Sequence, residues 1–187
     1  MRSDMNNASP IVSFCRALRR FLYGGSNELQ GSAAFQLLAP WQCGWLDGGC
    51  HILADAVQMW LGAAATTLWG VSHGQHLPDH IVVQCGGWYL DGDGVSSKRA
   101  LLRRWRRVEH VPGATLFPYN AAAGERSGIP RDRETSACLA QLLGRRWAGP
   151  AVVALLQRPP LAPWPANCNR PHVRQICRLP VTGGRPC

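Results

Sequence analysis

The chain has 187 residues and 46% of them are hydrophobic, so it is long enough and apolar enough to bury the core of one domain. No run approaches the ~20 apolar residues of a membrane-spanning helix, and the first ten residues lack the pattern of a secretory signal. We therefore expect a cytoplasmic protein without membrane contact, whose eight cysteines are reduced thiols rather than a disulfide framework.

The chain is strongly basic, with a formal net charge of +9. All but one of its 20 Lys and Arg residues are arginine, the exception being Lys98. Arginine binds phosphates and carboxylates through two parallel hydrogen bonds, which favours an anionic partner. A coding bias toward Arg, Ala, Gly, Pro and Trp is the alternative explanation of the same composition.

The first half of the chain predicts two helices. Residues 1–10 are expected to form a flexible tail, and apolar residues recur at helical spacing through residues 11–23. Residues 28–47 are interpreted as irregular. A second helix is predicted for residues 50–60. It is apolar on most of its faces, which is typical of a helix at the centre of a fold.

Strands are predicted in the middle of the chain. Residues 65–71 are rich in residues that favour strands. Residues 80–85 and 88–91 flank Gly86-Gly87, a direct signal for a hairpin with a two-residue turn.

The remainder predicts further helices and a tail. Residues 98–110 are expected to form a helix capped by Ser96 or Ser97, with residues 113–132 mostly in a loop. A helix is predicted for 133–143, interrupted by Gly144 and Pro150, and a helix or strand for 151–156. Residues 11–157 are thus interpreted as one domain, followed by a basic, proline-rich tail at 158–187.

Chemistry is indicated first by Cys50, which follows Gly48 and Gly49 at the start of the apolar helix. A helix N-terminus carries a partial positive charge that stabilises a thiolate, which is the nucleophilic form of cysteine. Its free N–H groups, including that of Cys50, can donate to a developing oxyanion. Gln42 is a possible side-chain donor for the same purpose.

A base for this thiol is expected from a strand, and His80 is the preferred candidate. If Gly86-Gly87 is a two-residue turn, Cys85 opposes Trp88 and His80 opposes Asp93, with Asp91 on the diagonal. The three side chains then share one face of the hairpin. A carboxylate there would orient the imidazole, and this register leaves both Asp91 and Asp93 open as the third member.

The order of a helical Cys, a strand His and a strand Asp resembles the papain-like superfamily. Gly48-Gly49-Cys50, His80-Ile81-Val82-Val83 and Tyr89-Leu90-Asp91 are similar to the motifs of transglutaminase-like proteins and arylamine N-acetyltransferases. The resemblance covers residues 48–94. It departs from those families at His51, where an aromatic residue is usual.

The resemblance implies an α+β, papain-like fold, in which a central Cys-bearing helix packs on a small antiparallel sheet with additional helices. It implies a thiol-dependent hydrolase or acyltransferase (peptidase, deamidase, deconjugase or transglutaminase-like) that acts on a protein or peptide and needs no cofactor. Cys50 and His80 would be catalytic, and the resemblance selects Asp91 over Asp93 as the third member.

Other interpretations are open. Cys50 is also compatible with a small core residue, His80 with a strand residue bonded to backbone, and the two aspartates with turn residues. A zinc site in the tail would use Cys168, His172, Cys177 and Cys187, although their spacing matches no common motif. The second functional hypothesis is a non-enzymatic inhibitor or adaptor, of phage or mobile-element type, that docks on nucleic acid or an acidic protein surface. It would use the basic helix face formed by Arg99, Arg103, Arg104, Arg106 and Arg107.

Overall fold

The computed structural model describes residues 9–24, 32–72, 78–126 and 131–159. The predicted tails, residues 1–10 and 158–187, lie outside the described residues except for their inner ends. The zinc ligands considered above also lie outside the described residues. No helix in the described ranges is both long and apolar enough to cross a membrane.

One antiparallel sheet organises these residues, with the strand order β4-β3-β2-β1-β5. Its central hairpin was predicted with the correct bounds, and Cys85 opposes Trp88 as expected. The prediction for 65–71 is also confirmed, with a shift of one or two residues. The strands are β1 (Thr67–Ser72), β2 (His80–Cys85), β3 (Trp88–Asp91), β4 (Gly94–Ser97) and β5 (Thr115–Pro118).

The end of the hairpin differs from the sequence-based register. After Asp91 the chain turns at once, because Gly94 adopts a φ of +100° and pairs with Asp91 to begin β4. Asp93 therefore lies in a tight turn and does not oppose His80 across two strands. The prediction that placed Asp93 directly opposite His80 is wrong for this reason.

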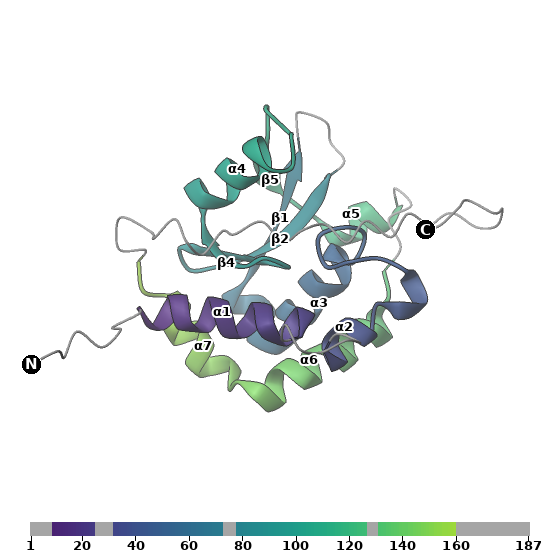
Figure 1. Ribbon diagram of the computed structural model, residues 1–187, viewed down its shortest axis with the longest axis vertical. Coiled ribbons are helices and arrows are strands. Elements are labelled where there is room, and N and C mark those ends of the chain that lie inside the picture. The colour runs from purple at the N-terminus through teal and green to yellow at the C-terminus, as the bar shows by residue number, and fades with distance from the viewer. Residues whose placement is uncertain (1–8, 25–31, 73–77, 127–130, 160–187) are drawn as a thin grey trace, which may run out of the picture.

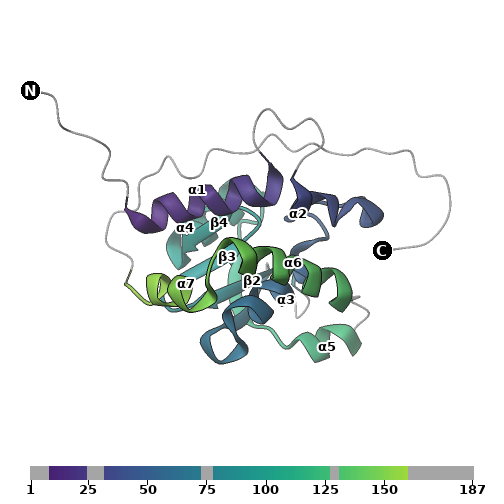
Figure 2. The same ribbon diagram turned by 90° about the horizontal axis from the view of Figure 1, so that it is seen from below.

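Helices cover the two faces of the sheet unequally. The Cys-bearing helix α3 (Cys50–Leu61) contacts β2 and β3 and also packs on α6 (Arg133–Arg146). On the same side, α1 (Pro10–Tyr23) contacts β4, and α7 (Gly149–Leu156) contacts α1 and α3. Figure 1 shows α1 and α7 on one side of the strands and α4 on the other, and Figure 2 shows the same helices from below.

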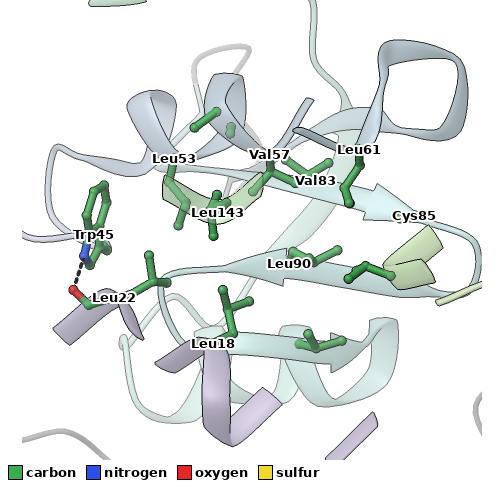
Figure 3. Close-up of a cluster of buried hydrophobic side chains, with 14 of the residues drawn as sticks. Leu18, Leu22, Trp45, Leu53, Val57, Leu61, Val83, Cys85, Leu90 and Leu143 are labelled. Carbon is green, nitrogen blue, oxygen red and sulfur yellow. Dashed lines mark hydrogen bonds between the residues drawn. The ribbon is translucent and has the colours of Figure 1, made fainter. Parts of the chain in front are cut away.

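The larger core lies between α3 and the sheet. Leu18 and Leu22 of α1, Val57 of α3 and Leu90 of β3 meet there with less than 3% of each side chain exposed (Figure 3). The indole N–H of the buried Trp45 donates to the carbonyl oxygen of Leu22 at 2.9 Å and so anchors the segment that leads into α3. This core fixes the start of α3 relative to β2 and β3.

The opposite face carries a smaller core. Val71, Val82 and Tyr89 project from β1, β2 and β3 onto Leu101 and Trp105 of α4 (Lys98–Arg107). The side chain of Ser97 accepts from the N–H of Ala100, which confirms the predicted cap. The helix ends three residues earlier than predicted.

Several elements were not expected from the sequence. Segment 113–132 was predicted to be mostly loop, yet it contains β5 and α5 (Ala121–Arg126). Residues 33–41, interpreted as irregular, contain the short helices α2 (Ala33–Gln36) and η1 (Ala39–Trp41), and η2 (Ala63–Ala65) follows α3. The α6 helix continues through Gly144 to Arg146. The described residues therefore form an α+β fold.

Candidate functional site

Cys50 is the first residue of α3, and the glycines before it fit a tight entry. Gly48 has a φ of +87°, a left-handed conformation that favours glycine. A Cβ atom on Gly49 would lie 2.8 Å from the carbonyl oxygen of Gly44, so a side chain there would displace the loop. The N-cap of α3 is Gly49, which has no side chain to accept from the first N–H groups of the helix.

His80 begins β2 and is fully enclosed, with 1% of its surface exposed. Its ring stacks on the indole of Trp105, with ring centroids 4.8 Å apart. Alternation along β2 places His80 on the same side as Val82, which faces α4. The imidazole is therefore fixed by packing as well as by its polar neighbours.

Asp91 ends β3 beside this imidazole. Its Oδ2 atom lies 3.4 Å from Nε2 of His80, at the long limit of a hydrogen bond. Within the described residues, the hydrogen bonds of both ring nitrogens of His80 are longer or less well aligned than the standard geometry.

The thiol of Cys50 is strongly perturbed. Burial alone would raise its pKa. Hydrogen bonds with the side chains of His51 and His80, the positive charge of His80 and the backbone N–H of Ile81 outweigh burial and lower the pKa to about 6. A cysteine with such a pKa is mostly thiolate at neutral pH.

The imidazole of His80 is perturbed in the opposite direction. Burial alone would lower its pKa, but hydrogen bonds and charge interactions with Asp91 and Cys50 raise it to about 9. The two shifts favour a thiolate–imidazolium pair over the neutral pair near neutral pH. Burial would raise the pKa of Asp91, and the charge of Arg104 together with His80 holds that pKa well below its usual range.

The structure thus brings together Cys50, His80 and Asp91, and it places the other candidates elsewhere. Asp93 binds Arg104 at 3.0 Å and Arg19 at 3.5 Å instead of His80. Gln42 is solvent-exposed and ends the η1 turn in a left-handed conformation, with φ of 50°.

One residue assigned to the basic helix face does not lie on it. Arg104 is 94% buried and pairs with Asp91 and Asp93, so it is not available to an external anion. Arg106 is exposed but donates from Nε and Nη2 to the carbonyl oxygen of Ala114. The basic face of α4 therefore contains fewer available arginines than predicted.

A small pocket beside the thiol was also missed by the sequence analysis. His51, Leu68, Ile81 and Tyr119 line it. A partly buried ion pair completes the wall, in which Arg131 donates to both oxygens of Asp55 at 2.8 and 2.6 Å. The one signal in the sequence was Asp55 itself, a carboxylate inside an apolar helix, because such a group requires a partner.

This arrangement has the parts of a thiol nucleophile with a base. Within the described ranges, no group of three or more His, Cys, Asp or Glu residues is placed to hold a metal ion. A thiolate, an imidazolium and an orienting carboxylate can support attack on an acyl carbon followed by protonation of the leaving group.

Comparison of the chain with protein-family models, with curated proteins and with solved structures found no match.

Proposed function

We propose that this protein is a papain-like, thiol-dependent hydrolase or acyltransferase in which Cys50 is the nucleophile and His80 is the base. The observation that carries the proposal is the convergence of Cys50, at the N-terminus of α3, with the buried ring of His80 and with Oδ2 of Asp91, which lies 3.4 Å from Nε2 of His80. The lowered pKa of Cys50 and the raised pKa of His80 support it. The three residues come from α3, β2 and β3, in the chain order of the superfamily that the sequence resembles.

In the proposed reaction, the Cys50 thiolate attacks the carbonyl carbon of an amide, thioester or isopeptide. Since Nε2 of His80 faces Asp91, Nδ1 is the nitrogen left to give its proton to the leaving group. Free N–H groups at the start of α3 stabilise the oxyanion. Water or an amine, deprotonated by the now neutral His80, then attacks the thioester and releases Cys50 as the thiolate.

The pocket beside Cys50 is the proposed site for the acyl group. Its apolar walls include Leu68 and Ile81, and Tyr119 is close enough for the thiolate of Cys50 to raise the pKa of its phenol, after the larger effect of burial. Asp55 and Arg131 neutralise each other in the wall. The pocket has room for little more than a water-sized group, so it is suited to a small uncharged acyl group of a protein or peptide substrate.

The test is acylation with an activated ester such as p-nitrophenyl acetate, followed by peptide-resolved mass spectrometry. Wild type should form an acyl adduct at Cys50 that decays with time, and His80→Ala should form it at least about tenfold more slowly at pH 6.5. Cys138, an exposed cysteine of α6, is the internal reference. Equal acylation of Cys50 in both proteins would contradict the proposal.

A second candidate function has one specific observation in its favour. Arg99, Arg103 and Arg107 are all exposed and recur every four residues, so they form one stripe along α4. A non-enzymatic binder would use this stripe on an anionic surface. Salt-sensitive retention on DNA that survives Cys50→Ala and is lost in the triple Arg→Gln variant would favour it over the enzyme.

A further inference from the structure

A guanidinium is buried between two carboxylates directly behind the proposed catalytic residues. The side chain of Arg104 is 5% exposed. Its Nη2 atom donates to Oδ2 of Asp91, and its Nη1 atom donates to Oδ2 of Asp93 at 3.0 Å. The proposed mechanism has no role for this side chain, although burying it requires this close pairing.

The same carboxylate oxygen faces both Arg104 and the imidazole. Oδ2 of Asp91 accepts from Arg104 and lies 3.4 Å from Nε2 of His80. The other oxygen, Oδ1, accepts from the backbone N–H of Asp93 at 2.9 Å. Both oxygens of Asp91 are thus held, and the plane of the carboxylate is fixed with respect to the imidazole.

The α4 helix supplies two constraints from adjacent residues. Arg104 holds Asp91, and Trp105 stacks on the His80 ring. One rigid helix therefore sets the position of both members of the His80–Asp91 contact. The α4 helix packs on the face of the sheet opposite α3, and it contacts Asp91 and His80 through these two residues.

We propose that Arg104 is a positioning residue that fixes the carboxylate of Asp91 toward the imidazole of His80. This inference rests on the proposed function. The negative charges of Asp91 and Asp93 are balanced by the positive charges of Arg104 and Arg19, without a contribution from the imidazole. The positive charge of His80 is then left to be balanced by the thiolate of Cys50.

The other groups that face this cluster come from two helices and from the turn that follows α4. Tyr23 of α1 lies near both carboxylates, Glu109 lies near Arg104, and His51 of α3 contacts Cys50. Arg104 donates to the Oδ2 atom that His80 also faces, so its replacement tests the positioning role directly.

Positioning and simple electrostatics predict opposite results. If Arg104 acted only through its charge, removing it would strengthen the effect of Asp91 on His80 and keep the imidazolium. If Arg104 positions Asp91, removing it frees the carboxylate to turn away. His80 then loses its proton more easily, and Cys50 needs a higher pH to ionise.

The experiment measures the pH at which iodoacetamide labelling of Cys50 is half-maximal, by peptide mass spectrometry, in four proteins. Arg104→Gln should raise this midpoint by one pH unit or more, which is about tenfold less labelling near pH 6. Arg104→Lys keeps the positive charge but loses the two parallel N–H donors of the guanidinium, and its labelling midpoint should lie between those of wild type and Arg104→Gln. Lys98→Gln, at an exposed position on the same helix, should match wild type.

The outcomes separate this inference from the proposed function. A low midpoint in wild type that is unchanged or lower in Arg104→Gln overturns the positioning role and leaves the proposed function intact. If Arg104→Gln does not fold, Arg104→Lys decides, because a midpoint equal to that of wild type overturns the role. A wild-type midpoint at the pH of an ordinary thiol overturns both.

Discussion

Asp91 and Asp93 lie two residues apart in the chain but have different partners at the site. The carboxylate of Asp91 faces His80 and Arg104, whereas the carboxylate of Asp93 pairs with Arg104 and Arg19. The difference arises because the chain turns between them, so that the two side chains leave the end of the hairpin from different backbone conformations.

We predict that Asp91→Asn reduces the rate of Cys50 acylation at least about tenfold, because the amide cannot stabilise the imidazolium. Asp93→Asn removes one anchor of Arg104 and should reduce the rate less than tenfold. Rates with p-nitrophenyl acetate at pH 7 measure both. A larger loss in Asp93→Asn than in Asp91→Asn would contradict the assignment of Asp91.

The sequence indicated some of these residues and concealed others. Cys50 and His80 could be found because they stand at the starts of strongly patterned elements. The contact between Asp91 and Arg104 was not predicted, because Arg104 was assigned to the exposed basic face of its helix. A signal did exist, because Arg104 lies three residues after Leu101 and next to Trp105, on the apolar side of α4.

At the scale of elements, the entry to α3 depends on a close approach of backbone to backbone. Gly49 donates to the carbonyl oxygen of Gly44 at 2.9 Å, and its missing Cβ leaves room for that oxygen. The turn from residue 44 to residue 49 thereby places Cys50 at the end of the helix that faces His80.

We predict that Gly49→Ala destabilises the protein by about 1–3 kcal/mol and slows the labelling of Cys50, because the added methyl group displaces the loop. Gly44→Ala is the matched control, since a Cβ at that position has no atom within 4 Å. Urea unfolding and iodoacetamide labelling measure the two effects. Equal stability of the two variants would contradict this account.

Regular elements with a strong local pattern were predicted well, and elements held by distant contacts were not. The helix at residues 10–23 and the 80–91 hairpin carry their own periodicity. The β5 strand has only four residues, none of them fully buried, and it pairs with β1 more than 40 residues away. Its sequence therefore offered no alternation to recognise.

At the scale of the whole molecule, the site joins the two cores of the fold. Cys50 belongs to the α3 side of the sheet, whereas His80 and Asp91 are held by α4 on the other side. The buried pair of Asp91 and Arg104 is part of this junction. Stability and site chemistry are therefore coupled through Asp91.

We predict that Asp91→Asn costs about 3–5 kcal/mol of unfolding free energy at pH 6, because a buried guanidinium loses a charged partner. The pKa of Asp91 is lowered in the folded protein, so its contribution is complete above the unfolded pKa of about 3.9 and declines as the pH falls below that value. Urea unfolding should show a smaller difference at pH 3 than at pH 6. A difference that does not change with pH would contradict the assignment.

The central claim is that Cys50 and His80 form an ionised pair near neutral pH. The most direct measurement is the rate of iodoacetamide labelling of Cys50 as a function of pH, resolved by peptide mass spectrometry, in wild type and in His80→Ala. We predict half-maximal labelling near pH 6 in wild type and a clear shift to higher pH in His80→Ala. Labelling of wild-type Cys50 that begins only above about pH 8, as for an ordinary thiol, would contradict the account.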